Sequence, residues 1–181
     1  NLKQYDLEPD YSNLFKVAGQ DSKEIILAVQ YVNSTLELST IGQMYNNGDG
    51  GWSSIVPTQN LVDTYEMADG LTKEESGSYD PNHPFAGRDP RMAMTIIYPG
   101  MDWNGTVVNT LDKTINGKDN ANYPPSANNA SKTALTWRKY LDEQYANGIW
   151  NTNACPIVIR YAEVLLTYAE AVNELSGPSA D

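Results

Sequence analysis

The chain has 181 residues and a formal net charge of −11 at pH 7, with an isoelectric point near 4.4. This charge excludes nucleic acid as the natural partner, because phosphates would be repelled, and it disfavours an anionic membrane surface for the same reason. The length fits one domain with a sizeable core, while 13 glycines and 10 prolines predict a loop-rich chain.

The first predicted element is a short buried strand at residues 25–29, an unbroken apolar run after Ser22. A long connection follows, in which the Asn/Gly/Asp cluster at 46–51 forms a turn with Tyr45 and Trp52 at its edges. We therefore expect both rings to be held by a loop and not by a regular element.

A helix is predicted to begin at Thr58, whose hydroxyl can cap it, and to end at Gly70. A second short strand is predicted over Met92–Tyr98 and is stopped by Pro99. The segment 101–131 is rich in Asn, Gly, Asp and Pro, which indicates a long surface excursion.

Near the C-terminus, residues 137–145 are predicted to form a short helix or strand, and Pro156 is expected to open a longer helix. In the segment 159–175 the polar residues fall on one stripe at spacings of 3, 4, 3 and 4: Arg160, Glu163, Thr167, Glu170 and Glu174. The other faces are apolar or small, so we expect packing partners on more than one side, as in the inner helix of a stacked helical array. Charged residues interrupt the run before the ~20 apolar residues needed to span a membrane.

The string PIVIRYAEVLLTYAEAVNEL at 156–175 resembles the signature helix of the SusD/RagB family of bacterial outer-membrane glycan-binding lipoproteins. Three further segments resemble that family in kind and order: SKEIILAVQY at 22–31, PTQNLVDTYEMADG at 57–70 and RDPRMAMTIIYPG at 88–100. The resemblance covers about residues 22–175 and is weakest between 101 and 136.

The resemblance implies a mainly α fold, in which a tetratricopeptide-like helical scaffold carries a loop-rich subdomain with a few short strands. Residues 1–181 would form one partial domain, with the loop-rich subdomain at 22–136 and a return to the scaffold at 137–175. It also implies a larger protein in which a lipidated N-terminus and further helix pairs come before Asn1. The partners implied are an oligosaccharide or polysaccharide and a SusC-like TonB-dependent transporter, on the outward face of the cell outer membrane.

The residues give little support for a catalytic site or a metal-binding site. The single histidine, His83, lies in a turn-rich segment, and converging Cys and His ligands for zinc are missing. The stretch from Asp112 imitates the start of a calcium loop, but Tyr123 stands where a bidentate Glu is required. We therefore expect no cofactor. Cys155 has no partner for an internal disulfide and is interpreted as a buried structural thiol.

Carboxylate pairs for glycoside hydrolysis cannot be identified from sequence, and the stripe carboxylates are better explained by solvation and by pairing of Arg160 with Glu163. Arg88, Asp89 and Arg91 match a family segment but are interpreted as structural: Asp89 can cap a turn, and the arginines can donate to loop carbonyls.

Most aromatic residues of the chain have a polar edge, since it contains 12 Tyr and 4 Trp but only 2 Phe. Such rings can pack on the apolar face of a sugar while amides and carboxylates meet its hydroxyls. The candidate carbohydrate-binding residues are Tyr45, Trp52, Trp103, Asn104 and Trp150.

The leading hypothesis is therefore non-catalytic binding of an oligosaccharide and its delivery to the transporter. The alternative is a helical-repeat module that binds a peptide or a partner protein.

Overall fold

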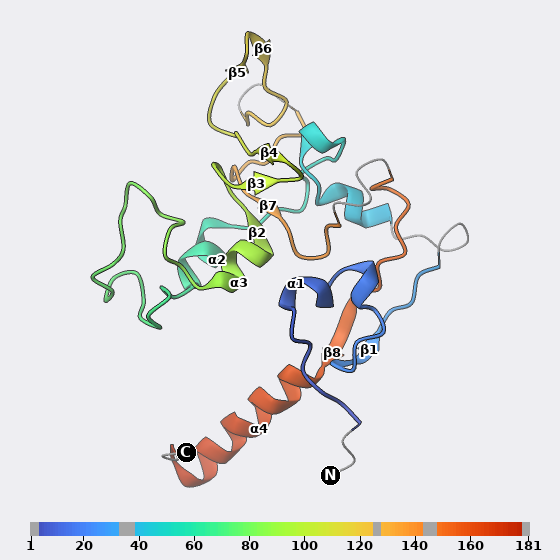
Figure 1. The fold of residues 1–181 in the computed structure, drawn as a ribbon, viewed down its shortest axis with the longest axis vertical. Coiled ribbons are helices and arrows are strands. Elements are labelled where there is room, and N and C mark those ends of the chain that lie inside the picture. Colours follow the sequence, from blue (N-terminus) through green and yellow to red (C-terminus); the bar gives the residue numbers. More distant parts are fainter. Residues whose placement is uncertain (1–3, 33–38, 125–127, 143–147, 179–181) are drawn as a thin grey trace.

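The computed structural model describes residues 4–32, 39–124, 128–142 and 148–178. Figure 1 shows short helices and strand pairs joined by long loops, with one long helix, α4 (Tyr161–Ser176), extending from one end. The other elements are α1 (Tyr11–Leu14), η1 (Val17–Gly19), β1 (Ile25–Ala28), η2 (Ser39–Gln43), η3 (Asn47–Asp49), α2 (Gln59–Thr64), α3 (Pro90–Thr95), β2 (Ile96–Ile97), β3 (Asp102–Trp103), β4 (Thr106–Val107), β5 (Thr114–Ile115), β6 (Lys118–Asp119), β7 (Thr136–Trp137) and β8 (Ile157–Arg160). The expected combination of loops with a few short strands is confirmed.

The strands form antiparallel pairs, and the pair β1–β8 ties the start of the chain to its end. Ile25 lies opposite Arg160, whose Nη1 donates to the buried carboxylate of Glu24 at 2.7 Å. Two predictions are therefore wrong: Pro156 does not open the helix, and Arg160 does not pair with Glu163. Four residues of strand separate Pro156 from α4, because the β-branched run after Pro156 pairs with β1.

The predicted strand over Met92–Tyr98 is mostly a helix. α3 begins after Asp89, whose carboxylate accepts from the Arg91 N–H at 2.8 Å, and Pro90 takes the first helical position. Only β2 is extended, and it pairs with β7, which lies at the start of the predicted segment 137–145. Residues 143–145 of that segment lie outside the described part of the chain.

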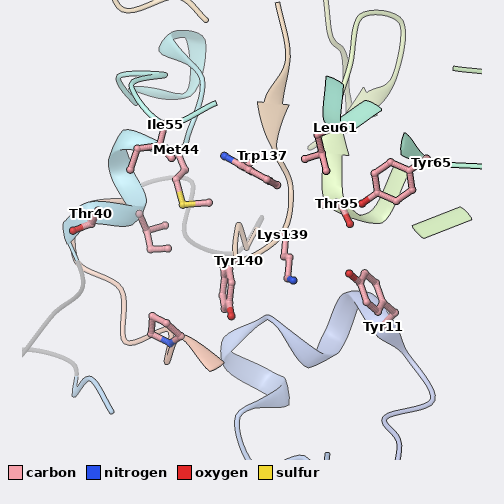
Figure 2. A pocket seen from close by; sticks show the side chains of 12 residues that line it. Tyr11, Thr40, Met44, Ile55, Leu61, Tyr65, Thr95, Trp137, Lys139 and Tyr140 are labelled. Carbon is pink, nitrogen blue, oxygen red and sulfur yellow. The ribbon is translucent and has the colours of Figure 1, made fainter. Parts of the chain in front are cut away.

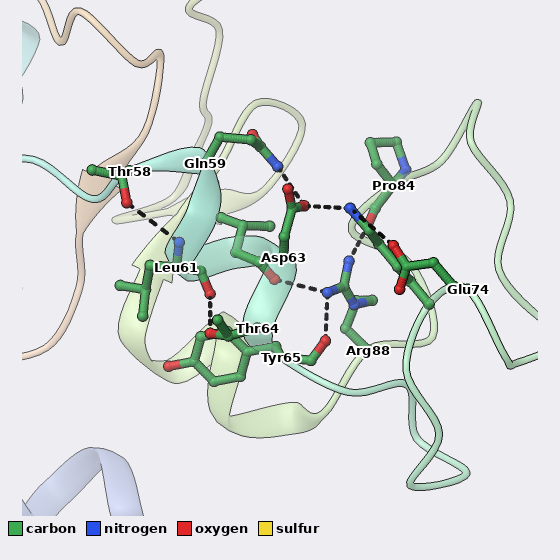
Figure 3. Close-up of polar contacts among 11 residues, drawn as sticks. Thr58, Gln59, Leu61, Asp63, Thr64, Tyr65, Glu74, Pro84 and Arg88 are labelled. Carbon is green, nitrogen blue, oxygen red and sulfur yellow. Dashed lines mark hydrogen bonds and ion pairs between the residues drawn. The ribbon is translucent and has the colours of Figure 1, made fainter.

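The helix predicted from Thr58 to Gly70 has the expected cap but is shorter. The Thr58 hydroxyl accepts from the Leu61 N–H, and α2 ends at Thr64. Figure 3 shows the guanidinium of Arg88 beside this end, where it donates to the carbonyls of Val62 (2.7 Å), Tyr65 (2.6 Å) and Pro84 (3.1 Å). The structural interpretation of Arg88 is thereby confirmed.

Two buried clusters form the core of the described residues. One joins Ile41, Tyr45, Ile97, Trp103, Leu141 and Ile149, and the other joins Val62, Met92, Ile96 and Leu135. Neighbouring side chains in a strand point to opposite faces, so Ile96 and Ile97 of β2 each contact a different cluster.

Helix α4 is not covered by the described part of the chain. Leu166, Tyr168 and Leu175 are 69%, 70% and 86% exposed, and no residue of the helix is buried. The prediction of packing partners on several faces is therefore not met within these residues, and the tetratricopeptide-like scaffold is not established by them.

Candidate functional site

The loop that follows Tyr45 is a tight turn closed by its own hydrogen bonds. Asn46 caps η3: its Oδ1 accepts from the Asp49 N–H at 2.9 Å, and its Nδ2 donates to Asp49 Oδ2 at 2.6 Å. Gly50 has φ of +86°, and a Cβ at Gly51 would lie 2.3 Å from the Tyr45 carbonyl oxygen. Both positions therefore require glycine, which explains the composition of this cluster.

Two of the five candidate residues are core residues. Tyr45 is 3% exposed, and its hydroxyl donates to the Asp142 carbonyl at 2.9 Å and accepts from the Asp142 N–H at 3.0 Å. Trp103 is 4% exposed, and its Nε1 donates to Asp49 Oδ2 at 2.9 Å. Neither ring presents a face to solvent, so the expectation that they stack on a sugar is corrected.

Trp52 and Trp150 form an aromatic pair at the surface. Trp52 is 50% exposed, and its ring lies 4.6 Å from the Trp150 ring at an interplanar angle of 56°. Trp150 is half-buried, and a Cβ at Gly42 would lie 2.3 Å from its ring. The close approach to Gly42 fixes Trp150, and Trp150 in turn supports Trp52.

Asn104 lies in the turn of the β3–β4 hairpin, exposed and with φ of +52°. It borders a polar hollow of about 230 Å³. The other polar side chains that line this hollow belong to Asn46, Asp49, Thr106, Asn109 and Asn122, and the rest of the lining is Gly48, Trp103, Val107, Val108 and Ile115. The sequence analysis did not select Asn109 and Asn122, although the Asn-rich composition of 101–131 was a signal for them.

Hydrogen bonds between distant segments hold the hollow in shape. Asn47 Nδ2 donates to the Ala121 carbonyl at 2.7 Å, and the Gly48 N–H donates to Asn122 Oδ1 at 2.7 Å. Burial raises the pKa of Asp49, and the hydrogen bonds from Trp103 and Asn46 oppose this shift. The site therefore offers amide groups and one carboxylate in a fixed arrangement.

The same loop connects the hollow to the exposed indole, because Asn46 and Asp49 lie at its start and Trp52 at its end. The arrangement combines an exposed aromatic face with polar groups that both donate and accept. It suits a ligand with an apolar face and a hydroxyl rim.

A second aromatic surface was missed by the sequence analysis. The rings of Phe85 and Tyr98 stack at 4.4 Å with an interplanar angle of 14°, and they line a cavity of about 560 Å³ with His83. His83 is largely exposed, and its Nδ1 lies 2.7 Å from Asp80 Oδ2, as expected for a solvated loop residue.

Metal ligands do not converge anywhere in the described ranges, since no group of three His, Cys, Asp or Glu side chains forms there. Cys155 is buried and forms no disulfide within the described part of the chain, in agreement with its interpretation as a structural thiol. None of the described helices is both long enough and apolar enough to cross a membrane.

Comparison with known proteins agrees with the resemblance. The SusD family profile matches residues 23–180. A SusD-like carbohydrate-binding protein from Bacteroides fragilis superposes with a TM-score of 0.80 at 31% identity, over 96% of this chain and 34% of that chain. A second SusD-like protein from the same organism gives a TM-score of 0.67 at 25% identity, over 96% and 37%.

The chain thus spans about a third of the length of these relatives. Neither the profile nor the two structures indicates an enzyme family. No curated protein matches the chain significantly.

Proposed function

Because the chain belongs to the SusD family, we propose that it binds an oligosaccharide at the surface formed by Trp52 and the polar hollow, and that it does not cleave this ligand. The observation that carries the proposal is the half-exposed indole of Trp52, supported from behind by Trp150. One structural relative is a carbohydrate-binding protein, which supports the ligand class.

The chemistry of the site fits this ligand. The indole face of Trp52 packs on the C–H face of a pyranose, while Asn104 and Asn122 meet hydroxyls at its rim. Asp49 is the single carboxylate among the described residues that line the hollow. Glycoside hydrolysis requires two carboxyl groups across the bond, so this site supports binding and release only.

The setting we propose is the outward face of the cell outer membrane, with a lipid anchor and a SusC-like TonB-dependent transporter that receives the glycan. Family membership supports this setting. A negatively charged protein of this kind favours neutral over acidic glycans.

We also propose that residues 137–175 belong to a tetratricopeptide-like scaffold, in which further helices cover α4. The wide apolar surface of α4 supports this, since exposed patches of this kind mark sites of packing or association. The same surface favours the second candidate function, the binding of a peptide or partner protein.

Titration calorimetry of the complete protein against neutral and acidic oligosaccharides tests the main proposal. We expect at least one neutral oligosaccharide to bind, and Trp52→Ala to weaken it by about tenfold or more, which corresponds to about 1.4 kcal/mol. Trp52→Phe retains a ring and is expected to keep most of the affinity. The control is Leu71→Ala, which removes another exposed apolar side chain from a separate loop.

Equal binding by Trp52→Ala and Leu71→Ala would reject the site, and no binding of any sugar would reject the function. Binding of peptides without sugars would instead support the second candidate.

A further inference from the structure

A larger cavity of about 620 Å³ lies where α1, η2, α2, α3 and β7 meet. Figure 2 shows side chains from these separate segments facing one space. Its volume falls in the range of about 300–1,000 Å³ that is usual for small-molecule sites. Much of the lining is aliphatic, including Ile41, Met44, Ile55 and Leu61. Such side chains cannot bond the hydroxyls of a sugar, so this cavity is chemically distinct from the surface at Trp52.

The indole of Trp137 brings an unused donor to this cavity. Its Nε1 is buried and has no hydrogen-bond partner in the described part of the chain. Figure 2 shows this nitrogen on the side toward Met44 and Ile55. A buried donor without an acceptor is rare and unfavourable, by about 1–3 kcal/mol. A ligand oxygen that reaches this nitrogen would remove that penalty.

Lys139 brings a positive charge that no carboxylate among the described residues matches. Its Nζ lies 4.0 Å from the ring centroid of Phe15, and no Asp or Glu of the described ranges reaches it within ion-pair distance. Burial lowers the pKa of Lys139, and the nearby cation Arg160 adds to this shift. Arg160 itself is paired with Glu24. The ammonium is therefore in surroundings that an anion would stabilise.

Hydroxyl groups lie on the same side of the cavity as the ammonium. Figure 2 shows the hydroxyls of Tyr11, Tyr65 and Thr95 turned toward the region of Lys139, while Met44 and Ile55 lie at the opposite side. The cavity thus has a polar, positively charged end and an apolar end. Hydroxyl and ammonium donors together are suited to a carboxylate.

We propose that this cavity binds a small carboxylic acid with an apolar body that carries one further oxygen acceptor. The carboxylate lies at Lys139 and the tyrosine hydroxyls, the apolar body lies against Met44 and Ile55, and the second oxygen accepts from Trp137 Nε1. A carbohydrate does not fit this pattern, because its hydroxyls would face the aliphatic end unpaired.

Titration calorimetry of the complete protein with three matched probes tests the proposal. The probes are 3-benzoylpropionate, which has a carboxylate, an aryl group and a ketone, 4-phenylbutyrate, which lacks the ketone, and 3-benzoylpropionamide, which lacks the charge. We expect the first to bind most tightly, several-fold better than the second and about tenfold or more better than the third.

Lys139→Met keeps the straight side chain without its charge, and it should remove the preference for the carboxylate over the amide. Lys132→Met, at an exposed lysine outside the cavity, should change nothing. Ile55→Trp fills the apolar end from a partly exposed position and should abolish binding of all three probes.

Equal affinity for acid and amide, an unchanged preference in Lys139→Met, or no saturable binding by the unmodified protein would each overturn the proposal. Oligosaccharide binding is measured on the same variants. It depends on Trp52 and is expected to remain in Lys139→Met, so failure of either proposal is distinguishable from failure of the other.

Discussion

Arg88 is the residue that most clearly links the sequence to the local structure. Its guanidinium is buried and donates to three carbonyl oxygens, two of them at the end of α2. A planar group with several fixed donors can serve diverging carbonyls at once, whereas a lysine ammonium cannot reproduce this geometry. The end of α2 and the loop at Pro84 are therefore held together by one side chain.

Replacing Arg88 by Met removes its hydrogen bonds to the carbonyls of Tyr65 and Pro84, while the Val62 carbonyl keeps its bond from the Tyr65 N–H at 3.2 Å. We expect a loss of about 3 kcal/mol in the free energy of unfolding, because hydrogen bonds to charged groups contribute about 1.5–3 kcal/mol each. Denaturant unfolding of the complete protein measures this loss. Arg91→Met is the matched control at an exposed arginine, for which we expect less than about 1 kcal/mol. Similar losses in the two variants would contradict the role of Arg88.

Asp89 links stability to pH. The hydrogen bond from Arg91 is the main cause that lowers the pKa of Asp89 in the folded state. Folding therefore favours the ionised form of Asp89. Its contribution to the free energy of unfolding is fully present above the pKa of an unfolded Asp, about 3.9, and is lost as the pH falls through the lower pKa of the folded state.

Asp89→Asn retains the capping acceptor without the charge. We expect it to be less stable than the unmodified protein above about pH 5, and the difference to shrink as the pH falls below about 4. Asp89→Ala also removes the cap of α3, and should be about 1 kcal/mol less stable than Asp89→Asn at neutral pH. A difference between native and Asp89→Asn that does not change with pH would show that the ion pair does not contribute.

At the scale of elements, caps were predictable from sequence and partners were not. Thr58 was identified as a cap, and the apolar run at Ile25 was identified as a strand. Met92–Tyr98 was misread because its apolar run fits either structure, and the deciding signal was Asp89 followed by Pro90. The strand β8 could not be foreseen, because its partner β1 lies more than a hundred residues earlier in the chain.

Helix α4 provides a prediction for the complete protein. If scaffold helices cover its apolar faces, Leu166→Glu places a charge in a packed interface and should reduce the free energy of unfolding by about 2 kcal/mol or more. Thr167→Glu lies on the polar stripe of the same helix and is the matched control, with an expected change below about 0.5 kcal/mol. Amide hydrogen exchange along residues 161–176 should be slow. Fast exchange together with two neutral variants would show that α4 remains exposed.

At the scale of the whole molecule, the sequence allowed the family and the loop-rich fold to be predicted, but not which rings lie at the surface. Tyr45 and Trp52 flank the same turn and have similar neighbours, yet one is buried and the other is half-exposed. Tyr45 can be buried because its hydroxyl is hydrogen-bonded to both the carbonyl and the N–H of Asp142, which lies 97 residues away in the sequence. Such a long-range partner cannot be identified from local composition, so only part of the candidate site could be selected in advance.

The central claim is that a sugar is held at Trp52 beside the polar hollow, and a crystal structure of the complete protein with the oligosaccharide selected by calorimetry tests it most directly. We expect one sugar ring to lie against the Trp52 indole at about 4 Å, with hydroxyls bonded to Asn104 or Asn122. A sugar bound instead between Phe85 and Tyr98, with the Trp52 indole still exposed to solvent, would contradict it.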